Sequence, residues 1–174
     1  ARFEDVRSGL ERAVAQDPGY AEGLASLSMH YINAVRFRFV GVDEAQGLRE
    51  AAMGLAQRAV QHAPNSSSAF HALALAQWFA RRVDESLSSN RTALRLNPND
   101  TELAADLSMR LSMRMQWEPA MHLYREAVSR DPFLLVTCRV TAFLYHYAAG
   151  RYADALEEVR QAYAPEVIYT HIMR

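Results

Sequence analysis

The sequence predicts an all-α chain of repeated antiparallel helix pairs, and three observations support this fold class. Prolines recur at 34-residue intervals, at Pro64, Pro98 and Pro132. Between them, apolar residues recur at the three- and four-residue spacing that is typical of helices. Glycine and proline are few, seven and six in 174 residues, whereas alanine, which has the highest helix propensity, is abundant. Each period has room for two short helices and two tight turns.

Four similar segments end the helix pairs, and each has an alanine five residues before a proline. They are residues 12–18, 58–64, 92–98 and 126–132. The first of them lies 46 residues before the second, which is one period plus 12 residues. The alanine lets two helices approach closely, and the proline ends the helix because it lacks an N–H and restricts the residue before it. Residues 97–100 are a strong turn signal. Thr101 should then begin the next helix, with Glu102 in its first turn, where a negative charge suits the helix dipole.

The apolar residues between these segments form stripes on helices. In the first helix of a pair, Leu24, Leu27 and Tyr31 form one stripe. Residues of similar character occupy the matching places one period later: Phe70, Leu73, Ala74 and Gln77. A second-helix stripe follows further along the chain, at Ala120, Leu123, Tyr124, Ala127 and Val128.

With this period and these residues, the sequence resembles the tetratricopeptide-repeat family, whose 34-residue repeat holds two antiparallel helices. Residues 150–156 match the family's Gly-x-Tyr-x-x-Ala entry to a second helix. Residues 117–120 match it more loosely, and Tyr124, Ala127 and Pro132 follow in register. The resemblance covers nearly the whole chain. It implies a right-handed α-α superhelix, or solenoid, in which stacking of neighbouring repeats supplies the stability.

Residues 1–174 are predicted to form a single array of such repeats, and the repeat register sets the boundaries within it. Residues 2–17 are expected to form a second helix without its first helix. The predicted repeats are residues 21–66, 67–100, 101–134 and about 135–165, with a further helix starting in residues 166–174. Two positions depart from the family pattern, because Ser86 and Asn90 stand where it prefers an alanine and an aromatic residue. The second helix of that repeat is therefore expected to pack less well.

The first predicted repeat carries a 12-residue insertion, and residues 33–44 are the expected tract. Val35, Phe37 and Phe39 alternate with arginines there, which would suit a strand edge, but a helix extension followed by a loop is favoured. The aromatic residues are expected to pack on neighbouring helices. The alternative is a loop that docks a partner, since insertions in solenoids cluster on one face, often the binding face.

Composition and motifs exclude most chemistry. All 19 basic residues are arginine, so there is no Schiff-base or phosphate-loop lysine. The single cysteine, Cys138, is expected to pack in a helix. The sequence has no nucleophile elbow, glycine-rich phosphate loop or zinc-protease motif. No two histidines share a close ligand spacing on one helix face; they are His30, His62, His71, His122, His146 and His171. We expect no catalytic residue, no metal and no cofactor.

Net charge and the length of the apolar stretches also limit the kinds of partner that the chain is expected to bind. A formal net charge of −1 disfavours a nucleic-acid role, and the apolar stretches are too short to span a bilayer. We therefore expect a cytoplasmic protein with a protein or peptide partner. The first residues, 1–5, are not a natural initiation site and indicate a processed chain or an excised fragment. An exposed terminal helix offers a surface either for a second copy, which would give a homodimer, or for sequence that is missing from the chain.

The resemblance implies a binding groove, because in this family the first helix of each repeat lines the concave surface. Methionine adapts to varied partners and tryptophan is a frequent hot-spot residue, so an apolar, methionine-rich lining favours protein binding. The alternative is that some of these side chains pack against the next helix. The residues projected into the groove are Met29, Ile32, His71, Leu75, Trp78, Met109, Met113, Arg139 and Phe143.

This lining differs from that of family members that clamp the acidic C-terminal tails of heat-shock chaperones. Those members place lysine, arginine and asparagine where alanine, methionine, leucine and histidine stand here. Capture of a terminal carboxylate in the groove is therefore disfavoured. Arg81, Arg82, Arg110 and Arg114 lie at the ends of first helices. They could form a positive rim, although the helix dipole by itself favours cations at those ends.

Taken together, these observations predict a non-catalytic scaffold that holds a peptide or a helical segment in its groove. The repeats are also similar to arrays found C-terminal to bacterial nucleotide cyclases and winged-helix transcription regulators. The alternative function is therefore a regulatory or dimerising module from a larger bacterial signalling protein.

Overall fold

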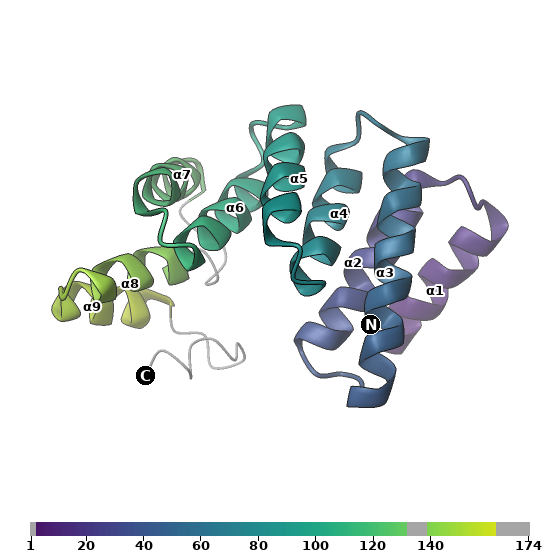
Figure 1. Ribbon diagram of the computed structural model, residues 1–174, viewed down its shortest axis with the longest axis horizontal. Helices are drawn as coiled ribbons and strands as arrows, with labels where there is room; N and C mark the ends of the chain where they lie inside the picture. The colour runs from purple at the N-terminus through teal and green to yellow at the C-terminus, as the bar shows by residue number, and fades with distance from the viewer. Residues whose placement is uncertain (1–2, 132–138, 163–174) are drawn as a thin grey trace. The chain divides into compact units, whose positions relative to one another are not determined.

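The computed structural model describes residues 3–131 and 139–162, and every regular element in these ranges is an α-helix. The predicted all-α class is therefore confirmed. Cys138, His171 and the segment 166–174 lie outside the described residues. The helices are α1 (Phe3–Gln16), α2 (Ala21–Arg36), α3 (Val42–His62), α4 (Ser67–Phe79), α5 (Val83–Leu96), α6 (Thr101–Met113), α7 (Trp117–Arg130), α8 (Arg139–Ala148) and α9 (Tyr152–Ala162), as labelled in Figure 1.

The chain falls into two compact units, Ala1–Asn97 and Pro98–Arg174. In the first unit, α1 packs on α2, the helices α2 and α3 pair, and α4 packs on both of them and on α5. The core of this unit contains leucine, isoleucine and many alanines, among them Leu24, Ile32, Ala52 and Ala59, which are each 0% exposed. Small residues at the contacts allow close approach of the helices.

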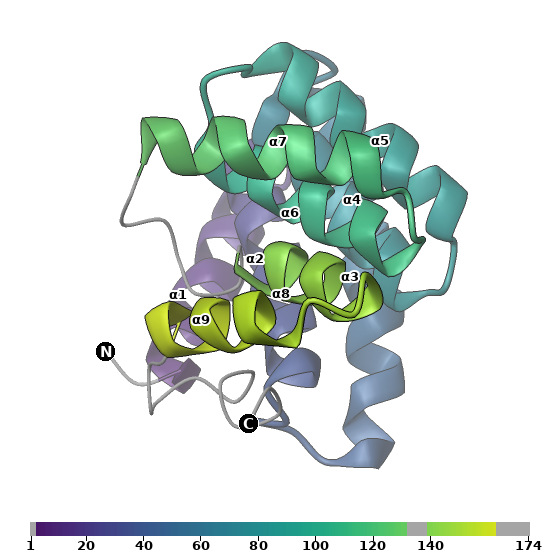
Figure 2. The ribbon, with the colours of Figure 1, turned by 90° about the vertical axis from the view of Figure 1, so that its left-hand side faces the viewer.

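In the second unit, α6 pairs with α7 and α8 pairs with α9, and the first pair also contacts α8. Figure 2 shows α8 and α9 side by side. The core here is formed by Ala105, Met121, Tyr124 and Ala142. The same alternation of first and second helices therefore builds both units.

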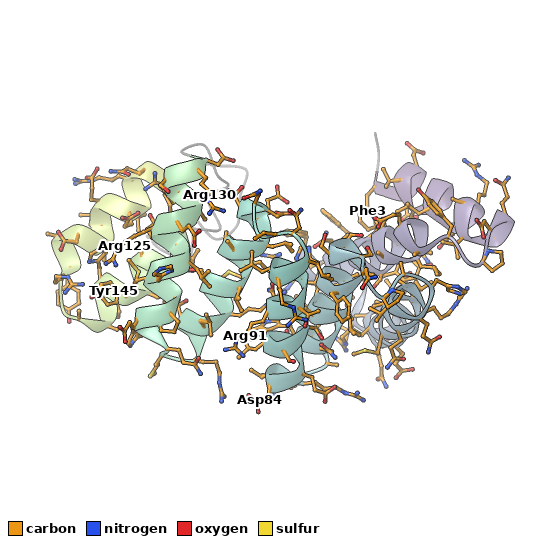
Figure 3. The ribbon with its side chains drawn as sticks, turned by 90° about the horizontal axis from the view of Figure 1, so that it is seen from above. Phe3, Asp84, Arg91, Arg125, Arg130 and Tyr145 are labelled. Atoms are coloured by element: carbon orange, nitrogen blue, oxygen red, sulfur yellow. The ribbon has the colours of Figure 1, made fainter. Side chains whose placement is uncertain are left out.

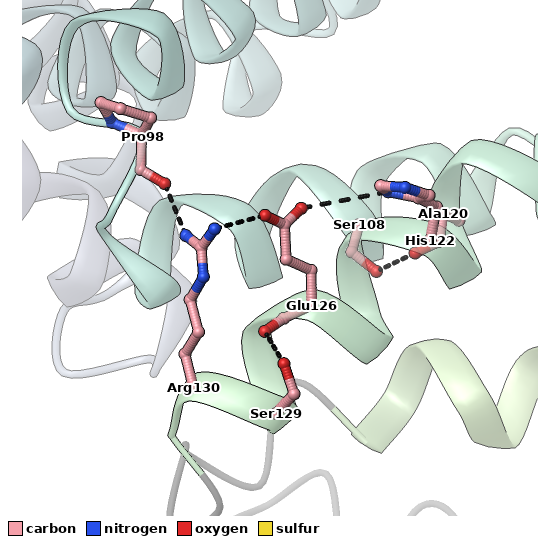
Figure 4. A network of polar contacts seen from close by, with 7 residues as sticks. All are labelled: Pro98, Ser108, Ala120, His122, Glu126, Ser129 and Arg130. Atoms are coloured by element: carbon pink, nitrogen blue, oxygen red, sulfur yellow. Dashed lines mark hydrogen bonds and ion pairs between the residues drawn. The ribbon is translucent and has the colours of Figure 1, made fainter.

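A buried serine–alanine hydrogen bond joins the two helices of a pair. Ser28 Oγ on α2 donates to the carbonyl of Ala52 on α3 at 2.8 Å. Ser108 Oγ on α6 donates to the carbonyl of Ala120 on α7, also at 2.8 Å (Figure 4). Because these four residues are at most 1% exposed, only small side chains fit at this contact.

The pair α4–α5 reverses the direction of this bond. Ser86 on the second helix donates to the carbonyl of Ala74 on the first helix at 2.6 Å. Ser86 and Asn90 are both 0% exposed. At Ser86 the expected poorer packing is therefore wrong: serine exchanges places with alanine across the contact, and its hydroxyl is satisfied by the facing carbonyl.

The turns from a first to a second helix have one geometry. In each, the second residue after the helix adopts a left-handed backbone, with φ of 56° at Arg38, 61° at Arg81, 56° at Met115 and 70° at Gly150. That residue and the next donate their backbone N–H groups to carbonyls in the last turn of the helix, which is the Schellman arrangement. Of these four, only Gly150 is the residue type that this backbone favours.

Side-chain caps begin two of the first helices. Ser66 accepts a hydrogen bond from the Ala69 N–H at 3.2 Å at the start of α4. Asp100 accepts from the N–H groups of Glu102 and Leu103, at 3.1 Å each, and α6 begins at Thr101 as predicted. These side chains satisfy backbone donors that have no partner within the helix.

The insertion lengthens both helices of its pair. The helices α2 and α3 have 16 and 21 residues, whereas α4 and α5 have 13 and 14. Residues 33–36 continue α2, residues 37–41 form the turn, and residues 42–44 already belong to α3. The tract is therefore a helix extension plus a loop, as favoured, and not a strand edge.

Candidate functional site

The residues projected into the groove differ in their exposure. Ile32 is 0% and Leu75 is 7% exposed, and both belong to the core of the first unit. Their side chains therefore pack in the core beneath the first helices and offer almost no exposed surface. Met29, His71 and Trp78, on α2 and α4, are half-buried, so part of each side chain reaches the surface of this unit.

In the second unit, Met113 at the end of α6 is the most exposed of the projected residues that the structure describes. Met113 is 48% exposed and Met109 is half-buried. Phe143 on α8 is half-buried, and its ring lies 5.8 Å from that of Tyr147 in a stacked arrangement. Tyr147 is 58% exposed. These side chains offer an apolar, adaptable contact surface.

Arg139 is held by the helix that pairs with its own. Its Nη1 donates to Glu158 Oε2 at 3.0 Å and to Gln161 Oε1 at 2.7 Å, both on α9. Tyr124 on α7 also donates its hydroxyl to Glu158 Oε2, at 3.2 Å. The Glu158 carboxylate on α9 therefore joins α7, through Tyr124, and α8, through Arg139, and Arg139 itself fixes α8 against α9.

Two aromatic residues with exposed surface were missed by the sequence reasoning. Phe79 and Tyr147 lie 34 residues before and after Met113, so all three occupy one place at the end of a first helix. Phe79 is half-buried. The repeat spacing itself is the signal that could have found them, once Met113 was singled out.

The four arginines that were expected to form a positive rim differ in their exposure. Arg110 is 1% exposed and forms an ion pair with Asp106, one helical turn before it, at 2.6 Å between Nη2 and Oδ2. It therefore contributes no exposed rim charge. Arg81, Arg82 and Arg114 are exposed. Other exposed arginines, such as Arg91 on α5 and Arg125 on α7, lie on second helices (Figure 3).

Two adjoining hollows lie beside the end of α4. Their volumes are about 330 Å³ and 590 Å³. Both are lined by Gln46 and Arg49 from α3 together with Phe79 and Ala80, and the larger hollow also by Trp78 and Arg81. Of the residues projected into the groove, only Trp78 lines either hollow. The α3 residues could not be found from the first-helix register, because they stand on a second helix.

The aromatic residues of the insertion gather with α1. The Phe3 ring stacks on His30 at 3.9 Å and lies 4.9 Å from Phe39, which in turn lies 6.0 Å from Phe37. The expected packing on a neighbouring helix is thus observed for Phe39, through Phe3, although Phe39 stays 60% exposed; Phe37 is 41% exposed and its ring contacts Phe39. Burial lowers the pKa of His30, since its charged form loses hydration there.

A second contact of the insertion is an ion-pair network. Arg7 on α1 donates to Glu11 at 2.9 Å and to Glu44, at the start of α3, at 3.0 Å. Tyr31 donates to Glu11 at 2.8 Å. These hydrogen bonds lower the pKa of Glu11, while burial and then the bond to Glu11 raise the pKa of Tyr31 to about 12. The lengthened α3 is therefore tied to α1 by charge.

The described part of the chain offers no metal centre and no membrane span. Residues 3–131 and 139–162 contain no group of three or more histidine, cysteine, aspartate or glutamate side chains that could hold a metal ion. Within these same ranges, no helix is long and apolar enough to cross a membrane.

Comparison with known proteins establishes the fold. No family model matches the sequence, and no curated protein matches it. The chain is similar to TTC0263, a thermophilic tetratricopeptide-repeat protein of Thermus thermophilus, at 18% identity and a TM-score of 0.75, covering 98% of this chain and 88% of that one. MamA matches at 17% identity and a TM-score of 0.66, covering 92% and 86%.

A third similar structure is YrrB, described as a tetratricopeptide-repeat protein with an unusual peptide-binding site. It is 16% identical with a TM-score of 0.62, covering 98% of this chain and 80% of its own. The chain therefore has the tetratricopeptide-repeat fold that the sequence predicted. None of the three is described as a cyclase or a transcription regulator, so that second resemblance stays a prediction.

Proposed function

We propose that the chain is a non-catalytic scaffold for protein–protein interaction, which binds a peptide or a helical segment along the faces of its first helices. The tetratricopeptide-repeat fold supports this proposal. One protein with that fold, YrrB, is described as having a peptide-binding site. A fold hosts many functions, so the surface of this chain has to carry the argument.

The observation that carries the proposal is the apolar surface at the ends of the first helices. Met113 and Tyr147 are 48% and 58% exposed, and they occupy one repeat position with Phe79. A single exposed large apolar side chain is ordinary, but in the second unit this one repeat position carries an exposed apolar residue on both α6 and α8, two helices that contact each other. Methionine and aromatic side chains are those that peptide-binding surfaces favour.

The buried members of the predicted set have a supporting role in this proposal. Ile32 and Leu75 hold α2 and α4 in the core of the first unit, and Arg139 holds α8 against α9. Partner contacts are then assigned to Met29, His71, Trp78, Met109, Met113 and Phe143.

The test begins with peptides selected from a random dodecapeptide library on the intact chain. The selected peptides should be rich in apolar residues. Met113→Glu should weaken their binding about tenfold or more, because a carboxylate in an apolar contact loses its hydration. Leu156→Glu is a matched control, since Leu156 is also 48% exposed but lies on the second helix α9.

Equal loss of binding in both variants, or none in either, would contradict the proposal, provided that far-ultraviolet circular dichroism shows both variants folded. A homodimer through the terminal helices is a separate prediction. Sedimentation equilibrium tests it directly, with a single monomer mass over a wide concentration range as the negative result.

A further inference from the structure

The insertion contributes one residue, Gln46, to the lining of the two hollows beside the end of α4. The second helix α5 begins at Val83, and the 34-residue register places Arg49 of α3 at the equivalent position. Residues 42–48 of α3 are therefore additional to the ordinary repeat. Gln46 belongs to this addition and Arg49 follows it. Both line both hollows from α3, and Glu50 and Met53 of α3 also line the smaller one. A repeat without the insertion has no residue equivalent to Gln46 in its second helix.

The two hollows share a lining but differ in chemistry. The smaller one adds the apolar side chain of Met53, beside Glu50 and Arg82. The larger one adds Trp78 and Arg81. Because they adjoin along α3 and share the Phe79 and Ala80 side, an elongated occupant fits them better than a compact one.

The charge of the lining is positive. Arg49 and Arg81 line the larger hollow. Among the residues that the structure describes, neither of their guanidinium groups makes a hydrogen bond or an ion pair. The carboxylate in the lining, Glu50, accepts a hydrogen bond from Gln46 at 3.1 Å, and Arg82 has Glu85 at 3.7 Å. The linings of the two hollows together therefore hold three arginines, Arg49, Arg81 and Arg82, and one carboxylate, Glu50.

The helix dipole explains only one of these two cations. Arg81 follows the C-terminal end of α4, where a positive charge is favoured. Arg49 lies in the N-terminal half of α3 (Val42–His62), where the dipole gives it no such advantage. The dipole therefore does not account for Arg49, which lines the same hollow as Trp78 and Arg81.

We propose that these hollows bind an acidic, extended peptide segment of a partner protein. A carboxylate of the segment would lie between Arg49 and Arg81, in the charge-assisted hydrogen bonds that guanidinium groups form best. A neighbouring aliphatic side chain would pack on Met53 and Phe79. This surface shares Trp78 and Phe79 with the proposed first-helix surface but adds residues of α3, and the inference stands whether or not the first-helix faces bind a peptide.

The test uses Trp78 as its own reporter. The chain has two tryptophans, so Trp117→Phe, a change in the second unit, leaves Trp78 as the single emitter. The probe is a decapeptide in which glutamate alternates with leucine. The matched control peptides carry glutamine or lysine in place of glutamate. The glutamate peptide should shift the Trp78 emission saturably, and the control peptides should bind at least about tenfold more weakly.

Two substitutions remove the cations without disturbing the fold. Arg81→Gly suits the left-handed backbone of the turn, and Arg49→Gln keeps a good helix former. Each should weaken binding of the glutamate peptide about tenfold, as expected for loss of a charge-assisted hydrogen bond. Arg91→Gln, on the exposed surface of α5 and outside both hollows, should leave binding unchanged.

Several results would overturn the inference. They are equal binding of the glutamate and glutamine peptides, unchanged binding in both arginine variants, absence of any emission shift, and an identical shift with inorganic phosphate alone. The last would show a simple anion site and no peptide site. Met113→Glu should not alter this titration, so the failure of either proposal is seen separately from the other.

Discussion

The helix pairs α2–α3 and α6–α7 share one framework. In both, a serine of the first helix donates to an alanine carbonyl of the second. In both, an arginine of the second helix reaches back to a proline carbonyl before the first helix: Arg58 to Pro18 at 2.8 Å, and Arg130 to Pro98 at 2.9 Å (Figure 4). Both turns place a non-glycine residue in the left-handed region.

The two pairs differ at the turn end. The lengthened α3 forms one wall of two hollows and an ion pair with α1, whereas α7 has the ordinary length of 14 residues. His30 on α2 and Arg110 on α6 occupy the same repeat position but carry different charge chemistry. The comparison shows that the contacts between paired helices repeat along the chain, whereas the residues at the turn between the two helices differ from pair to pair.

The largest expected effect comes from enlarging the alanine at the shared contact. Ala52→Leu and Ala120→Leu should each destabilise the chain by about 2–3 kcal/mol, because both alanines are 0% exposed and a leucine forces the helices apart. Urea unfolding followed by circular dichroism measures this. If the framework is truly equivalent in the two pairs, the two costs agree within about 1 kcal/mol. A cost in one pair alone would break the comparison.

Removing the serine hydroxyl is a gentler form of the same test. Ser28→Ala and Ser108→Ala should each cost about 1 kcal/mol, the usual net contribution of a buried hydrogen bond. The same urea titrations report it. A gain in stability would show that the serine is placed for a reason other than this bond.

The turns should respond in the opposite direction. Arg38→Gly and Met115→Gly should each stabilise the chain by about 1 kcal/mol, since glycine adopts a positive φ without strain. Gly150→Ala should destabilise it by a similar amount. Thermal unfolding of the three variants beside the unmodified chain decides the sign, and a loss of stability at both Arg38 and Met115 would refute the shared turn geometry.

A smaller effect is a pH dependence of stability that His30 gives to the pair α2–α3 and that the pair α6–α7, with Arg110 at the same position, lacks. Burial lowers the pKa of His30 in the folded chain, so the unfolded chain binds this proton first as pH falls through about 6.5. His30 therefore lowers stability as the solution becomes acidic and costs nothing at pH 8. The change in urea midpoint between pH 8 and pH 5.5 should be smaller in His30→Gln. An equal change in both proteins would show that His30 titrates normally.

Much of the fold could be predicted from the sequence. Proline spacing and the alanine before each proline are local signals, and they locate the ends of the helices. The cap at Asp100 is equally local, since it acts on the next few backbone N–H groups. The serine of α5 misled the prediction, because a buried serine is satisfied only when a facing carbonyl is known to lie within reach.

The site was harder to predict because the exposure of a side chain depends on which neighbouring helices pack over it. The register placed Ile32 and Trp78 at the same repeat position, yet one is fully buried and the other half-buried. The hollows join Arg49 to Trp78 and Arg81 across about thirty residues, through an insertion whose conformation the repeat pattern does not specify. Only Arg110 had a missed local signal, the i, i+4 spacing from Asp106.

Methionine oxidation tests the central claim most directly, since Met113 and Met115 are two residues apart and exposed by 48% and 75%. Dilute hydrogen peroxide is applied to the intact chain with and without a saturating selected peptide, and mass spectrometry gives each oxidation rate. A peptide on the first-helix face should slow oxidation of Met113 several-fold and leave Met115, in the turn, unchanged. Equal rates at Met113 with and without the bound peptide would contradict the proposed binding surface.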